Sequence, residues 1–209
     1  MSDIVHTAVY DTLADWEVGL ATAHINNEMW QRDPGRYRIV TVGLTNEPVT
    51  TKGGWRITPD IALADLGPTD SKMLILPGAD TWLNGENAPF AKTARGFLDA
   101  GVPVAAICGA TAGLAVEGLL DDRRHTSNAR EFLAGTGYRG GQHYVDELAV
   151  ADRDLITATA TAPIDFARAV LDRLDVYTPS VLASWYKLYG HNDPAGYFEL
   201  MSSMPEPAE

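Results

Sequence analysis

The chain has 209 residues, 45% of them hydrophobic, and its 16 Lys and Arg against 28 Asp and Glu give a formal net charge of -12. This length suits one domain with a real core. The negative charge argues against nucleic acid or anionic membranes as partners, because both are bound largely through cationic side chains. One cysteine cannot form an internal disulfide, the N-terminus lacks a signal-peptide pattern, and no apolar run approaches the roughly 20 residues that span a bilayer, so we expect a cytoplasmic protein.

Segments typical of strands and helices alternate along the chain. In chain order, the pattern predicts a strand at 4–10, a helix at 12–27, strands at 37–45, 55–63 and 71–78, a helix at 88–101, a strand at 102–108 and a helix at 109–120. The same alternation of strand and helix patterns continues over 123–128, 147–159 and 164–174. Such alternation predicts an α/β fold with a doubly wound, mostly parallel sheet and helices on both faces.

The same pattern predicts a single domain, 1–209, with its core at about 4–176. Residues 177–201 are rich in aromatic side chains, and we expect them to form a helical extension that packs on the domain or on a partner subunit. Residues 202–209 are expected to be frayed.

Cys108 lies where the apolar run 102–108 meets a run of small residues. In parallel sheets, ligands bind beyond the carboxyl ends of the strands, which is where this cysteine falls. Ala106 and Ala110 satisfy the need of a tight nucleophile turn for small residues on both sides, and Gly109 offers a backbone N–H for an oxyanion. The following helix N-terminus favours the thiolate. The alternative is a small core residue, because free cysteine is often buried.

Glu17 is an acidic residue on a helix face that is otherwise largely apolar. Leu13, Trp16, Leu20 and His24 have the spacing of one such face, and Glu17 lies within it. Burial would raise the pKa of its carboxyl, so that it could donate a hydrogen bond to a thiolate. The alternative is that Glu17 lies at the edge of the stripe and reaches solvent.

Other candidate motifs are weaker. Asp80 and Trp82 follow a strand end and either line a pocket or, for Asp80, cap a turn. Residues 135–141, GTGYRGG, match a dinucleotide fingerprint but lack the preceding strand and following helix, so we predict a loop. The five histidines show no metal-ligand spacing, and we expect neither a metal nor a cofactor.

Together, 71–80, 102–115, 123–128 and 156–176 resemble the ThiJ/PfpI superfamily over about residues 4–176. The resemblance implies a flavodoxin-like sandwich of the class I glutamine amidotransferase type and homodimers. It also implies that Cys108 is the elbow cysteine and Glu17 its protonated partner, and that backbone N–H groups at Gly78 or Ala79 and at Gly109 form an anion pocket.

The chain departs from the pattern of this superfamily at the histidine. PfpI-type peptidases have a histidine directly after the cysteine, where this chain has Gly109. The deglycase branch has one at the end of the strand after the elbow helix, where Asn128 stands here and His125 lies three residues earlier. Strand periodicity puts these two side chains on opposite faces, so His125 reaches the cysteine as a catalytic partner only through a local bulge.

Three functions fit these residues. The leading hypothesis is a cysteine enzyme acting on a small electrophile by glyoxalase-like, deglycase-like or hydratase-like chemistry, since this needs no histidine. The second is an amidase, peptidase or glutamine-dependent hydrolase, which must protonate a leaving amine. The third is a non-catalytic stress or redox sensor that uses oxidation of Cys108.

Overall fold

The computed structural model describes residues 2–204, so the last five residues of the segment 202–209 lie outside the described residues. Seven strands form one sheet, in the order β5-β2-β1-β6-β7-β9-β8. The strands are β1 (Asp3–Ala8), β2 (Tyr37–Gly43), β5 (Ile61–Ala62), β6 (Met73–Leu76), β7 (Val104–Ile107), β8 (Ala149–Asp152) and β9 (Leu155–Ala158). All neighbours pair in parallel except β8 and β9, which confirms the predicted mostly parallel α/β sheet.

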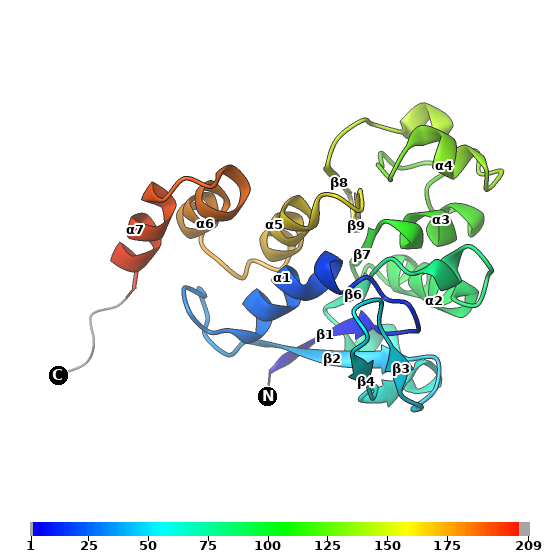
Figure 1. The fold of residues 1–209 in the computed structure, drawn as a ribbon, viewed down its shortest axis with the longest axis horizontal. Coiled ribbons are helices and arrows are strands. Elements are labelled where there is room, and N and C mark those ends of the chain that lie inside the picture. The colour runs from blue at the N-terminus through cyan, green and yellow to red at the C-terminus, as the bar shows by residue number, and fades with distance from the viewer. Residues whose placement is uncertain (1, 205–209) are drawn as a thin grey trace.

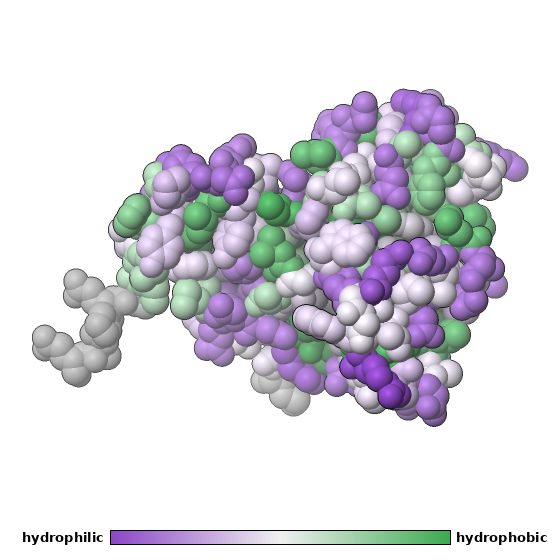
Figure 2. Space-filling view, in the orientation of Figure 1, coloured by the Kyte–Doolittle hydropathy of each residue, from purple (hydrophilic) through white to green (hydrophobic). Residues whose placement is uncertain are grey.

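Helices cover both faces of the sheet, as the alternating sequence pattern predicts (Figure 1). They are α1 (Asp15–Asn26), α2 (Ala88–Asp99), α3 (Gly109–Val116), α4 (Arg130–Ala134), α5 (Pro163–Arg173), α6 (Pro179–His191) and α7 (Ala195–Ser202). One apolar cluster joins α2 and α3 to the sheet through Phe90, Phe97 and Leu114, and the other joins α1, α5 and α6 to it through Phe166 and Trp185. On the face seen in Figure 2, hydrophilic and hydrophobic residues are interspersed.

Two predicted strands differ from the structure. The segment 55–63 is divided between β4 (Arg56–Ile57), which pairs with β3 (Val49–Thr50) in a separate hairpin, and β5. Pro59 lies between the two pieces and has no N–H for a ladder. The segment 123–128 forms only an isolated bridge, His125 to Tyr144, because the N–H of Thr126 donates to a side chain, the Thr157 hydroxyl, at 2.9 Å.

The parallel strands bring several chain segments to one edge of the sheet. Leu76 is paired with Ala106, and Ile107 with Ala158, so β6, β7 and β9 end side by side. The loops that follow these strands therefore meet at the position where parallel sheets bind ligands. The N-terminal turn of α1, which follows β1, reaches the same edge, since the N–H of Ala14 donates to Gly78 O at 2.9 Å.

Candidate active site at Cys108

Cys108 forms the turn between β7 and α3. Its backbone has φ 59° and ψ −124°, a conformation that costs energy for any residue with a side chain. The N–H of Cys108 donates to Ala158 O at 3.0 Å, which ties the turn to β9. Ala106 and Ala110 are both completely buried around it, as a tight elbow requires. Cys108 is only partly buried and lies at the edge of the apolar cluster of α1, α5 and α6, so it is not enclosed in the core.

Glu17 is buried beside the cysteine. Its side chain has no solvent exposure, so the alternative in which it reaches solvent is wrong. Oε2 accepts a hydrogen bond of 2.6 Å from the N–H of Gly78, whereas Oε1 has no partner among residues 2–204. Burial raises the pKa of the Glu17 carboxyl to about 7, although the Gly78 N–H and a hydrogen bond with Cys108 oppose the rise.

The predicted apolar stripe of α1 has the wrong phase. Trp16 is 54% exposed and Leu20 is only partly buried. Glu17 instead lies on the buried face itself, whose members are Glu17, Val18, Ala21, His24 and Ile25. The phase shifts because Leu13 precedes the helix and packs in the opposite cluster, with α2 and α3.

Gly78 is the point where the loop after β6 touches both reactive side chains. A Cβ atom at this position would lie 2.7 Å from Glu17 Oε2, 2.7 Å from Cys108 Cβ and 2.9 Å from Cys108 Sγ. Any side chain here would separate the pair, so the glycine has a steric role as well as donating its N–H. The resemblance implies Gly78 or Ala79 as a donor to a bound anion, but the Gly78 N–H is already bonded to Glu17, and the steric reason for this glycine is visible only in the structure.

The Cys108 thiol is held in its protonated form. Burial raises its pKa to about 11, and the negative charge of Glu17 raises it further, while the Asn128 amide and the Gly109 N–H oppose the rise. The Gly109 N–H at the start of α3 lowers the pKa of the thiol, as expected of a helix N-terminus, but burial and Glu17 raise that pKa more. The Glu17 carboxyl is therefore the first of the pair to lose its proton, and above about pH 7 a carboxylate faces a thiol.

Asn128 completes the contacts of the sulfur. Its Nδ2 donates to Cys108 Sγ at 3.4 Å, and its Oδ1 accepts from the N–H of Ala160 at 2.9 Å. The second bond fixes the orientation of the amide, so that the group facing the sulfur is a hydrogen-bond donor. Asn128 can stabilise negative charge at the site but cannot act as a base.

The structure does not bring His125 to the cysteine. Its Nδ1 contacts Arg123 O at 2.7 Å and its Nε2 contacts the Tyr138 hydroxyl at 3.2 Å. The ring packs edge-on against Tyr138 and Tyr144, and burial lowers its pKa. His125 is thus buried and engaged with Arg123 and two tyrosines, and the chemistry at the sulfur has to proceed without it.

The three predicted site residues in the segment after β6 make different contacts. The Ala79 N–H has no acceptor within the described chain, so it is free to face an oxyanion. Trp82 packs under α3, where its indole N–H donates to Pro77 O at 2.9 Å and to the Tyr10 hydroxyl at 3.0 Å. Asp80 is exposed and forms an ion pair of 2.8 Å with Lys52 on the β3–β4 turn. Of these three residues, Trp82 and Asp80 have side chains bonded elsewhere, and Ala79 has a backbone N–H without an acceptor among residues 2–204.

Sequence reasoning missed two residues near the pair. Lys52 lies close enough to Glu17 for its positive charge to oppose the rise of the carboxyl pKa. The Trp16 indole donates to Ala160 O at 3.3 Å, in the loop that orients Asn128. The sequence placed Trp16 only on an apolar helix face and gave no sign of its bond to the loop after β9, and nothing in the sequence connects Lys52 to this site.

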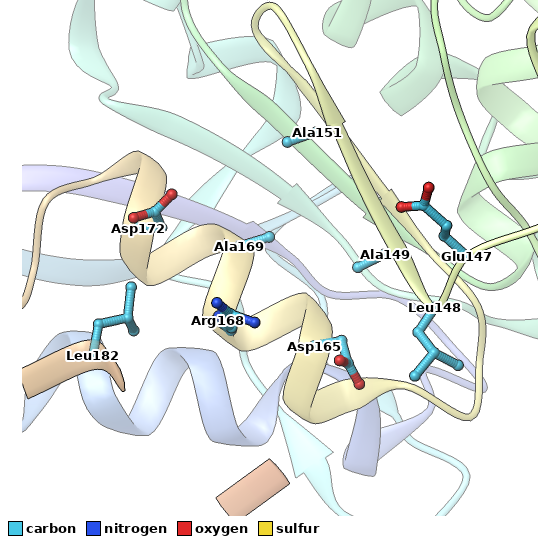
Figure 3. A pocket seen from close by; sticks show the side chains of 9 residues that line it. All are labelled: Glu147, Leu148, Ala149, Ala151, Asp165, Arg168, Ala169, Asp172 and Leu182. Carbon is cyan, nitrogen blue, oxygen red and sulfur yellow. The ribbon is translucent and has the colours of Figure 1, made fainter. Parts of the chain in front are cut away.

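The two grooves of largest volume among those of residues 2–204 described here lie away from Cys108. One, of about 470 Å³, runs between β8 and α5, where Arg168 lies between Asp165 and Asp172 on α5 and Glu147 lies on the opposite side (Figure 3). The other, of about 480 Å³, lies between α1 and the β3–β4 hairpin. Within residues 2–204 no group of three His, Cys, Asp or Glu side chains is placed to hold a metal ion. No helix in that range is long and apolar enough to cross a membrane.

Known proteins share both the sequence and the fold. The DJ-1/PfpI family matches residues 4–173. "Uncharacterized protease YoaZ" of Bacillus subtilis (strain 168) is 40% identical over 203 residues, which cover 96% of this chain and 97% of that protein. "Uncharacterized protease YdeA" of the same organism is 35% identical over 82% of this chain and 83% of its own length.

A crystal structure gives the same result in three dimensions. The thiJ/pfpI family protein from Bacillus anthracis superposes with a TM-score of 0.91 at 39% identity, over 98% of both chains. The elbow cysteine, the buried glutamate and the glycine between them thus lie in a fold that a solved structure of this family shares almost throughout. The chain belongs to the DJ-1/PfpI family.

Proposed function

We propose that this protein is an enzyme that adds Cys108 to the carbonyl carbon of small electrophiles such as 2-oxoaldehydes. The observation that supports the proposal is the Glu17–Cys108 pair, in which a carboxyl with a pKa of about 7 lies against a protonated thiol. A group with this pKa both accepts and returns protons efficiently near neutral pH. The pair can therefore supply the acid and base chemistry that other enzymes obtain from a histidine.

The first step is the formation of a hemithioacetal. As the bond from Sγ to the carbonyl carbon forms, the thiol proton passes to the Glu17 carboxylate and the π electrons of the carbonyl move to its oxygen. The N–H groups of Ala79 and Gly109 and the Asn128 amide are the donors available to that oxygen. Glu17 then returns the proton to the alkoxide.

The later steps need only water. In the hemithioacetal, the hydrogen on the former aldehyde carbon leaves as a proton and is returned to the neighbouring carbonyl carbon, while the hydroxyl proton passes to the oxygen of that carbon, which gives a thioester. Hydrolysis of the thioester by one water then releases a 2-hydroxy acid and regenerates the thiol. Glu17 is the group placed to move that proton. A small-molecule substrate, a homodimer and a cytoplasmic location remain part of the proposal.

Peptide hydrolysis is the second candidate, because two relatives are named as uncharacterized proteases. In that reaction Glu17 would have to protonate the leaving amine, and a peptide would have to reach a partly buried thiol. Redox sensing is less well supported. Oxidation proceeds through the thiolate, which the raised pKa of Cys108 makes scarce.

The number of product molecules formed per subunit distinguishes the three functions. The protein is incubated with methylglyoxal, and 2-hydroxy acid is measured per subunit in the wild type, Cys108→Ser and Glu17→Gln. We expect many products per subunit in the wild type and at least a hundredfold loss in either variant, the scale of a general acid–base contribution. No more than one molecule consumed per subunit, or casein cleavage that disappears in Cys108→Ser, would overturn the proposal.

A further inference from the structure

Trp16 is an exposed aromatic residue that bonds to the loop after β9, which also orients Asn128. It precedes Glu17 in the first turn of α1, and 54% of its surface is accessible. A large aromatic ring gains free energy when it is covered, so a ring left in solvent next to a reactive site is available to a ligand. The chemistry at Cys108 described above makes no use of it.

One hydrogen bond ties this ring to the loop that orients Asn128. The indole N–H donates to Ala160 O at 3.3 Å. The backbone N–H of Ala160 donates to Asn128 Oδ1, and the Asn128 amide donates to Cys108 Sγ at 3.4 Å. The indole therefore spans from α1 to the loop after β9, three hydrogen bonds from the sulfur. A ring fixed in this way loses little freedom when a ligand packs on it.

The charges near the site favour an uncharged substituent. Lys52 is the cation that acts on Glu17, and its ammonium is 2.8 Å from Asp80, with which it forms an ion pair. Because that charge is already matched, an anionic substituent would gain little from it. An apolar, flat substituent would instead gain contact with the indole face.

We propose that Trp16 forms an aromatic wall at the entrance to the Cys108 site and selects electrophiles whose reactive carbon carries an aromatic or flat apolar substituent. The proposal rests on the proposed function for its class of substrate. Its test does not require turnover, because any thiol-reactive probe with such a substituent passes the same entrance. The reaction with a maleimide is suitable: Sγ bonds to one alkene carbon, the thiol proton goes to the other, and nothing leaves.

The experiment compares N-benzylmaleimide with N-ethylmaleimide. The chain contains one cysteine, so the gain in mass reports Cys108 alone. Each rate is divided by that of N-acetylcysteine with the same reagent, which removes intrinsic reactivity. We expect the wild type to favour the benzyl reagent by about 2- to 10-fold, the effect of one aromatic contact. Trp16→Ala should abolish this preference, and Trp16→Phe should keep most of it.

Phe198→Ala is the matched control, since Phe198 is also an exposed aromatic residue, at 68%, but lies on α7 at the other end of the molecule (Figure 1). It should leave the ratio unchanged. A wild-type ratio equal to that of the free thiol would overturn the proposal. So would equal loss in Trp16→Phe and Trp16→Ala, since the indole N–H bond would then be responsible. Absence of methylglyoxal turnover alongside a wild-type benzyl preference would instead count against the proposed function alone.

Discussion

A carboxyl that titrates at the working pH of the cell is unusual, and here its position explains it. Glu17 is completely buried and has one N–H donor, that of Gly78, on Oε2. Burial therefore raises its pKa to about 7, and its charge in turn raises the pKa of Cys108. The two protons belong to the pair, so removing one member must change the titration of the other.

Glu17→Gln should simplify the pH dependence of Cys108 alkylation by iodoacetamide. In the wild type we expect a rise near pH 7, where the carboxylate forms and can accept the thiol proton, and a second rise at high pH. The variant should lose the first rise, and its thiol should titrate below pH 11, because the negative charge of Glu17 no longer opposes ionisation. Rates from pH 5 to pH 12 are measured by mass spectrometry. A rise near pH 7 that persists in the variant would assign it to another group.

Single residues differ in how far the sequence predicts them. Cys108 and Glu17 were identified because each breaks a local pattern, one at a strand end with small neighbours and the other within an apolar stripe. The partner of Asn128 lies 32 residues further along the chain, and Lys52 reaches the site from a separate hairpin. Those contacts depend on the tertiary arrangement of loops, which local periodicity does not contain.

At the scale of elements, α3 packs closely on Trp82 because Gly113 has no side chain at the contact. A Cβ on Gly113 would lie 2.2 Å from the Trp82 ring, which packs in the same cluster as α2 and α3. By contrast, a Cβ on Gly96 of α2 would meet no atom within 4 Å. The two helical glycines therefore have different reasons to be present.

Alanine should have opposite effects at these two positions. Gly113→Ala forces the helix away from Trp82 and should lower the free energy of unfolding by about 1–3 kcal/mol, as overpacking does. Gly96→Ala should raise it by up to about 1 kcal/mol, because alanine is the better helix former and its side chain meets nothing. Urea unfolding of both variants and the wild type measures the difference. Equal effects at the two positions would show that the contact with Trp82 does not hold α3.

Hydrophobic periodicity predicted the strands and helices correctly where backbone N–H and C=O groups bond to one another. The buried strands β6 and β7 and the helices that follow β1 and β7 lie within their predicted ranges, and β1 begins one residue before its predicted range. The prediction was wrong at 123–128, where buried polar side chains such as Thr126 take the place of a strand ladder. A pattern of polar and apolar residues cannot distinguish these two ways of satisfying a backbone N–H.

At the scale of the whole molecule, one buried histidine links the first helix to the C-terminal helices. His24 Nδ1 contacts the Tyr177 hydroxyl at 2.7 Å, and the Trp185 indole N–H donates to His24 Nε2 at 3.1 Å. Residues 177–201 thus pack on their own domain, through α6 on α5 and α1. The sequence left open whether these aromatic residues meet the domain or a partner, since His24 lies far from them in the chain.

Acid should loosen this link. Burial lowers the pKa of His24 from 6.5 to about 4, so the fold favours the neutral ring. Its contribution is complete above pH 6.5 and is lost as the pH falls through 4, by about 3 kcal/mol in total. Urea unfolding between pH 7 and pH 3 should show a steeper loss of stability in the wild type than in His24→Gln, which cannot bind the proton. Parallel curves would contradict the assignment.

The distance in sequence between these partners also bears on synthesis. The hydroxyl and the indole that satisfy His24 are 153 and 161 residues further along the chain. A ribosome makes α1 early, and this helix then waits for almost the entire remaining chain before its last side-chain partners exist. Until α6 is made, the apolar side chains of α1 and α5 that pack against it stay exposed. A nascent chain stalled before Tyr177 therefore presents that surface to chaperones.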